Sequence, residues 1–166
     1  MKTILAILVL AFSSRQAAAQ YSYSASLTGN VSVYAIQSLT FTGGSVIPSF
    51  NSLDDYINGV VANNYVSVGV KSNVSWTLSV QAESAFFTPS SQSGSTNMPC
   101  SVLSVKQSGS NNYIPLSTNS QTIKTGNKGG LNNAGNSFGL DLRYNPGFMY
   151  KGDIYNLGLI YTLTHQ

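Results

Sequence analysis

The fold is decided by the stretch VSVGVKSNVSWTLSVQA, which occupies residues 66–82. Residues 66–70 carry valine at every second position, and residues 74–82 carry an apolar residue at every second position. An alternation with a period of two is typical of strands that turn one face to a core and the other to solvent. Because the polar pair Ser72-Asn73 separates the two runs, we predict a β-hairpin here.

The same alternation recurs along the chain. It is long in residues 138–144 and 155–163, and shorter strands are predicted at residues 39–42, 101–106, 113–116 and 121–124. Turn-rich stretches between them, at residues 88–99, 107–112 and 126–136, are typical of surface loops. Seven or more short strands at this spacing predict an all-β fold, an immunoglobulin-like antiparallel β-sandwich. No stripe of helical period has a useful length, and residues 52–60 fit one helical turn at most.

The first 19 residues have the pattern of an export signal. Lys2 precedes the short apolar run at residues 4–12, and Ala17-Ala18-Ala19 provides small residues for cleavage. We therefore predict a signal peptide at 1–19, an N-terminal strand at 20–35 and a sandwich domain at 36–166. No later segment approaches the roughly 20 apolar residues that a membrane-spanning helix needs, so no membrane insertion is expected.

Charge is scarce in this chain. Only 8% of the residues are charged. Of eight Lys and Arg, Lys2 and Arg15 leave with the signal, so six basic residues face five acidic ones. No basic cluster is present to neutralise phosphates, which excludes nucleic acid as a partner. Cys100 is the single cysteine, so an internal disulfide is impossible, and we expect a buried or half-buried thiol.

Groups suited to catalysis are few. His165, the single histidine, stands beside the C-terminus, where a relay with Ser or Cys would not be held rigidly. Zinc prefers several His or Cys ligands, and the chain has two such residues. The five carboxylates are Asp54, Asp55, Glu83, Asp141 and Asp153. Glu83 and Asp141 fall on the outward positions of their strands. We therefore expect no catalytic residues, no metal, no cofactor and no enzymatic activity. A secreted hydrolase that uses two acids is the weakest alternative.

Two further predictions concern single residues that are known elsewhere to carry function. Trp76 shares the inward positions of its strand, so we predict a core residue and not a sugar-stacking platform. A Lys–Asn isopeptide bond with Glu83 as its acid would need a buried lysine, and each lysine here has an outward or loop position. The tyrosines at 21, 23, 34, 65, 113, 150 and 155 are candidates for a sticky surface.

The N-terminal segment carries the strongest functional signal. Its alternating apolar positions are Tyr21, Tyr23, Ala25, Leu27, Val31 and Val33. Chain termini are usually polar and ragged unless something holds them in place. Two interpretations remain: the segment is the first strand of its own sandwich, or its front part adds to the sheet of a neighbouring subunit.

Several short motifs resemble those of a known group of proteins. Residues 145–150 (NPGFMY), 152–155 (GDIY) and 161–164 (YTLT) are similar to the close of small secreted β-sandwich proteins of Bacteroidota, archaic chaperone–usher pilins and spore-coat-like fimbrial subunits. Residues 55–59 (DYING), followed by the strand that holds Trp76, fit the Bacteroidota pattern too. The chain differs from the pilins because Cys100 has no partner and because the penultimate residue, His165, is not aromatic.

The resemblance implies an extracellular, filament-forming or adhesive role. We therefore predict a secreted structural subunit of a filament or surface layer, which forms a homopolymer by β-strand donation. The alternative is a monomeric secreted β-sandwich binding module, with host or environmental glycans as its expected partners.

Overall fold

The structure is a computed structural model that describes residues 30–44 and 48–166. The predicted signal peptide and the predicted donor residues Tyr21, Tyr23, Ala25 and Leu27 lie outside the described residues. Residues Tyr34–Gln166 form one compact unit, to which the following description applies.

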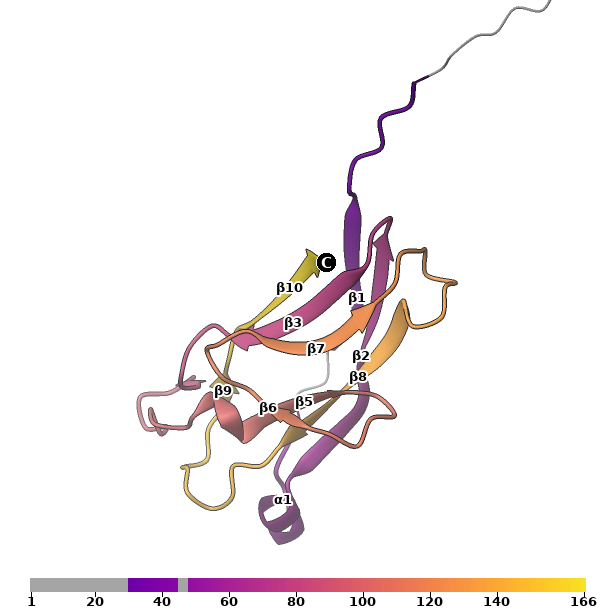
Figure 1. Cartoon of the computed structure of the whole chain (residues 1–166). Helices are drawn as coiled ribbons and strands as arrows, with labels where there is room; N and C mark the ends of the chain where they lie inside the picture. The colour runs from indigo at the N-terminus through magenta and orange to yellow at the C-terminus, as the bar shows by residue number, and fades with distance from the viewer. Residues whose placement is uncertain (1–29, 45–47) are drawn as a thin grey trace, which may run out of the picture. The chain divides into compact units, whose positions relative to one another are not determined.

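Two antiparallel sheets make up most of this unit (Figure 1). The five-stranded sheet has the order β1 (Gln37–Gly43), β2 (Val60–Ser72), β8 (Ser137–Tyr144), β5 (Leu103–Gln107) and β6 (Ile114–Pro115). The three-stranded sheet has the order β10 (Leu159–His165), β3 (Trp76–Ala82) and β7 (Gln121–Gly126). A short pair joins β4 (Thr88–Pro89) to β9 (Tyr155–Asn156), and two short helices are α1 (Leu53–Asn58) and the 3₁₀ turn η1 (Cys100–Val102).

The core lies between the inner faces of the two sheets. Its fully buried side chains include Val68 and Val70 of β2, Leu140 of β8, and Trp76 and Leu78 of β3. These are the inward positions that the alternation predicted, so the predicted all-β, immunoglobulin-like sandwich without a disulfide is confirmed. The strand orders β1-β2-β8-β5 and β10-β3 match the A-B-E-D and F-C orders of an immunoglobulin sandwich.

The end of the core near Trp76 is sealed by side chains. The indole is fully buried, stacks on Phe138 with ring centroids 6.2 Å apart, and donates Nε1–H to the Asn127 carbonyl oxygen at 3.0 Å. The side-chain oxygen of the buried Asn136 lies 3.3 Å from the same nitrogen. The predicted core position of Trp76 is confirmed, and the polar N–H has the partners that a buried donor needs.

The predicted hairpin at Ser72-Asn73 is wrong. β2 pairs with β1 and β8, whereas β3 pairs with β10 and β7, so the connection crosses from one sheet to the other. The Ser72 hydroxyl bonds both the N–H and the C=O of Val74, which holds the sharp bend. Paired strands and strands that face each other across a core place the same residues inward, so alternation alone does not distinguish these two arrangements.

The N-terminal part of the compact unit and α1 lie at opposite ends of the sandwich (Figure 1). β1 begins at Gln37 opposite Ser72, the last residue of β2, and α1 comes just before Val60, the first residue of β2. Ser52 and Asp55 form a capping box that starts α1, within the stretch 52–60 where one helical turn was predicted.

Candidate assembly edge and aromatic groove

The first candidate feature is the free edge of β10. β10 pairs with β3 along seven residues, and among residues 30–44 and 48–166 no strand pairs with its other edge. Its inward side chains Leu159, Tyr161 and Leu163 pack on the core but are only half-buried. An edge of this kind presents unpaired N–H and C=O groups together with incompletely covered apolar side chains, which is a template for another strand.

β1 ends the other sheet on the same side of the sandwich. The rings of Phe41 of β1 and Tyr161 of β10 meet with centroids 4.8 Å apart, although the two strands belong to different sheets. Phe41 is still 43% exposed. On this side, the core is therefore covered by side chains such as Phe41 and Tyr161, and none of the described strands lies over it.

The second feature is a groove of about 780 Å³ next to the start of β10. Leu142, Leu103 and Phe87 of the core form part of its wall, together with Leu159, the first residue of β10. The other aromatic residues that line it are Phe50, Tyr56, Tyr65, Tyr144, Tyr150 and Tyr155. Its volume falls in the range of ligand pockets, and its lining is mostly apolar, as such pockets usually are.

An aromatic ladder borders the groove. Tyr56 of α1 contacts Phe50 at 5.4 Å and stacks on Phe148 at 5.2 Å between ring centroids. Close to it in sequence, large apolar side chains remain exposed, namely Leu53, Ile57, Phe148, Met149 and Ile154. Of these, Ile154 lines the groove itself, and exposed apolar residues beside a concavity indicate an interaction surface.

Polar bonds hold one wall of the groove in place. The Tyr155 hydroxyl donates to the Lys151 carbonyl oxygen at 2.6 Å and accepts from Ser95 N–H at 3.0 Å. Asp153 accepts from the Ser91 hydroxyl at 2.8 Å and from Ser91 N–H at 3.0 Å. The side-chain bond from Ser91 is the largest effect on the Asp153 carboxyl and holds its pKa below the ordinary value.

Two tyrosines, Tyr144 in the lining of the groove and Tyr161 of β10, are partly sheltered from water. Burial raises the pKa of both Tyr144 and Tyr161 to about 12, so both stay neutral at physiological pH. The groove therefore offers neutral aromatic faces with hydroxyl groups, a chemistry suited to apolar or sugar-like partners.

Of the predicted assembly residues, the structure describes Val31 and Val33. Both are outside any strand and are 85% and 78% exposed. Residues 30–36 are in no strand, whereas the predicted N-terminal strand runs to residue 35. Whether residues 20–29 pair within the chain or with a neighbour stays a prediction.

Asn73 holds the backbone that leads into β1. Its side-chain amide donates to the Tyr34 carbonyl oxygen at 2.7 Å, and its side-chain oxygen accepts from Ile36 N–H at 2.8 Å. Its own N–H donates to the Ile36 carbonyl oxygen at 3.3 Å. The side chains of Tyr34 and Ile36 remain exposed at 82% and 71%.

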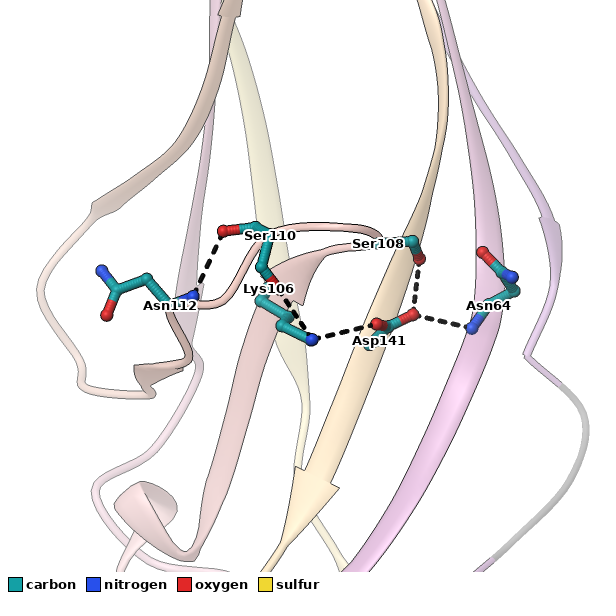
Figure 2. Close-up of polar contacts among 6 residues, drawn as sticks. All are labelled: Asn64, Lys106, Ser108, Ser110, Asn112 and Asp141. Carbon is teal, nitrogen blue, oxygen red and sulfur yellow. Dashed lines mark hydrogen bonds and ion pairs between the residues drawn. The ribbon is translucent and has the colours of Figure 1, made fainter.

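Asp141 is more deeply buried than its outward strand position predicted. Its outward position is right, but the side chain is only 5% exposed because neighbouring residues cover it. Its carboxylate accepts from Asn64 N–H at 2.8 Å and from the Ser108 hydroxyl, and it lies 3.5 Å from the Lys106 ammonium (Figure 2). Desolvation raises the pKa of Asp141, but the bonds from Ser108 and Asn64 and the charge of Lys106 outweigh it, so the pKa lies below its ordinary value.

This cluster also bears on the isopeptide alternative. Lys106 is less exposed than its outward position suggested, with 16% of its side chain accessible. The Asp141 carboxylate lies between Lys106 and Asn64, and Asn64 offers its backbone N–H to it (Figure 2). Glu83, the acid proposed for such a bond, is exposed and packs beside Gly158. The arrangement pins β5, β8 and β2 together without bringing a lysine, an asparagine side chain and Glu83 together.

The other chemically notable residues have structural surroundings. Cys100 is buried, as expected, with Sγ 3.4 Å from the Leu116 carbonyl oxygen. His165 is the exposed last residue of β10 and lies opposite Trp76 of β3. Over residues 30–44 and 48–166, no three His, Cys, Asp or Glu side chains gather closely enough to hold a metal ion. Within the same described part, no helix has the length and apolar character to cross a membrane.

Of the tyrosines predicted to form a sticky surface, Tyr65, Tyr150 and Tyr155 line the groove. Tyr113 lies elsewhere, with the Lys106 ammonium 4.7 Å from its ring centre. No protein-family model matches the chain, and a comparison with curated proteins found no match to it, so the candidate site rests on the geometry above.

Proposed function

We propose that this protein is a non-catalytic, extracellular structural subunit that forms filaments or a surface layer by β-strand donation between copies. The observation that carries the proposal is the free edge of β10, where seven residues of backbone have no partner strand among residues 30–44 and 48–166. In an immunoglobulin sandwich this position, beside strand F, is taken by strand G. A strand from another copy would complete the three-stranded sheet.

The N-terminal segment has the properties of such a donor. Tyr21–Leu27 has the same number of residues as β10, and apolar residues occupy its alternate positions. A strand presents alternate side chains to one face, so these residues would cover the half-buried Leu159, Tyr161 and Leu163. Burying each large apolar side chain contributes about 1.5–3 kcal/mol, which is enough for several together to join subunits without a covalent bond.

Export supports the same proposal. The first 19 residues have the pattern of a signal peptide, and the low content of charged residues suits a protein that works in an assembly outside the cell. The homopolymer is the expected partner, and neither a cofactor nor nucleic acid has a role in it.

The direct test is electron microscopy of the chain expressed from Gln20, next to a chain that lacks residues 20–27. We expect filaments from the first and soluble single subunits from the second. Adding a synthetic peptide of residues 20–27 to the shortened chain should raise its melting temperature. Normal filaments from the shortened chain would contradict strand donation.

A second candidate function is glycan binding, and the aromatic groove favours it. Sugar rings stack on aromatic faces, and Tyr56 and Tyr150 line the groove beside polar residues such as Asn156. Screening of the single subunit against a glycan array tests this candidate. Binding that is lost in Tyr56→Ala but kept in Tyr113→Ala, whose ring lies outside the groove, would favour the glycan-binding function.

A further inference from the structure

The segment that would follow a donated strand carries exposed apolar side chains. Val31, Val33, Tyr34 and Ile36 are each between 71% and 85% exposed, and none belongs to a strand. Asn73 fixes the backbone of Tyr34 and Ile36 through three hydrogen bonds. The side chains of these two residues nevertheless remain exposed to solvent. Four large side chains so exposed in six residues indicate a surface that another molecule covers.

The aromatic groove lies where this segment would arrive. All strand pairs of the fold are antiparallel, and a donor antiparallel to β10 would place Tyr21 near His165 and Leu27 near Leu159. Leu159 is itself a wall of the groove. Residues 28–36 would then continue past the start of β10 and across the groove, since nine extended residues reach about 30 Å.

We propose that the aromatic groove of one copy binds residues 31–36 of the copy that donates its strand. This inference rests on the proposed function and adds a second contact to it. The partner is a second copy of the chain, and the contact is apolar, between Val31, Val33, Tyr34 and Ile36 and the ring faces of the groove.

Residues 31–36 and the groove lie at different places on the chain, so a contact between them would add further copies one after another. Ile36 precedes the first residue of β1 at one end of the sandwich, and the groove adjoins α1 and Leu159 at the other. A contact between two different surfaces joins copies head to tail, and such a contact does not close on itself unless the rotation between copies forms a ring. Each added subunit would therefore offer a new groove and a new free edge.

Peptide binding separates this inference from strand donation itself. The target is the chain from Gln20 with Tyr23→Asp and Leu27→Asp, which is expected to donate no strand but to keep its own groove and β10 edge. Three labelled peptides are compared by fluorescence polarisation: residues 20–27, residues 20–36, and residues 20–36 with serine in place of Val31, Val33, Tyr34 and Ile36.

We expect the 20–36 peptide to bind at least about tenfold more tightly than the 20–27 peptide, because it buries additional apolar side chains. The serine-substituted peptide should bind like the short one. Ile154→Asp in the target places a charge on the groove wall and should remove the tenfold advantage while leaving the affinity for residues 20–27 unchanged. Phe86→Asp is the matched control, since Phe86 is 51% exposed, Ile154 is 59% exposed, and Phe86 does not line the groove.

The outcomes are distinct. If the 20–27 and 20–36 peptides bind equally, the groove contact is wrong and strand donation stands. If neither peptide binds, strand donation fails as well. If Ile154→Asp leaves all peptide affinities unchanged but abolishes binding of an oligosaccharide, the groove belongs to a glycan.

A second measurement applies if the doubly substituted target is insoluble. The same peptides are added to the unmodified chain, and assembly is followed by light scattering. The 20–36 peptide should then inhibit at about one tenth of the concentration that the 20–27 peptide needs. Equal inhibition would again overturn the groove contact.

Discussion

The sandwich has a sealed region around Trp76 and an open region along β10 and the groove. Both are built from inward-facing apolar residues of neighbouring strands. Trp76 and Leu78 of β3 are fully buried, whereas Leu159, Tyr161 and Leu163 of the adjacent β10 stay half-buried. The difference arises because β3 has a partner strand on both edges, whereas β10 has a described partner strand on one edge only. An inward position therefore predicts the direction of a side chain, and burial depends on which strand lies next to it.

The largest expected difference between the two regions is in the free energy of unfolding after a large side chain is truncated to alanine. Trp76→Ala should lower the free energy of unfolding by about 3–5 kcal/mol, as large truncations in a packed core do. Leu163→Ala in β10 should cost only about 1 kcal/mol in the single subunit, because the side chain is already partly in water. Chemical denaturation of both variants checks this, and similar losses would show that β10 is as well covered as β3.

The next effect concerns the cluster of Asp141, Lys106, Ser108 and Asn64, which links β8, β5 and β2 on the outer face of the five-stranded sheet. Asp141→Ala should lower the free energy of unfolding by about 2–4 kcal/mol, because Lys106 and the Asn64 N–H lose their partner away from bulk water. Asp54→Ala, which removes an exposed carboxylate, is the matched control and should change it by less than about 0.5 kcal/mol. Equal effects in urea denaturation would mean that the cluster contributes little.

A smaller effect is expected from pH. The folded-state pKa of Asp141 lies below its ordinary value, so its contribution to stability is present above about pH 4 and is lost as the pH falls through the folded-state pKa. Asp55 and Asp153 act in the same direction. Asp141→Asn should therefore flatten the fall in stability below pH 4. A parallel fall in wild type and variant would contradict the role given to Asp141.

The smallest effect on the single subunit is expected from the donor segment. Tyr23→Asp and Leu27→Asp should abolish filaments, because each places a charge on the face that enters the neighbour's core. Ser24→Asp, on the opposite face, should assemble normally. All three should change the unfolding of the unassembled subunit by less than about 0.5 kcal/mol. A large loss of stability in the first two would indicate that the segment pairs within its own chain.

The alternation in the sequence was sufficient to locate most of the long strands and the core, but the predicted single strand at 155–163 is divided into β9 (Tyr155–Asn156) and β10 (Leu159–His165), which lie in different sheets. Period-two alternation predicted the inward faces of β2, β3, β8 and β10, and Trp76 lies in the core as expected. It did not predict which strands pair, because the bend at Ser72 and a hairpin there produce the same alternation. The burial of Asp141 was also not predictable from its strand, because its cover comes from Asn64, Lys106 and Ser108, which are distant in sequence.

The candidate site was predictable only in part. The donor residues follow from alternation near the N-terminus, and Tyr65, Tyr150 and Tyr155 were recognised as candidates for an interaction surface. Their grouping into one groove depends on α1, β9 and the residues around Pro146 meeting in space. The local sequence pattern of each segment does not show which distant segments lie next to one another in the fold. The free edge of β10 likewise becomes visible only with the strand order.

Hydrogen exchange along β10 tests the central claim most directly. Amide exchange of Leu159–His165 is measured in filaments of the chain from Gln20 and in the unassembled Tyr23→Asp, Leu27→Asp variant. We predict that the β10 amides that point away from β3 exchange rapidly in the single subunit and become strongly protected in the filament, while amides in the interior of β3 are protected in both. Equal exchange of β10 in the two states, in a sample that contains filaments, would show that subunits join by another surface and would contradict strand donation at this edge.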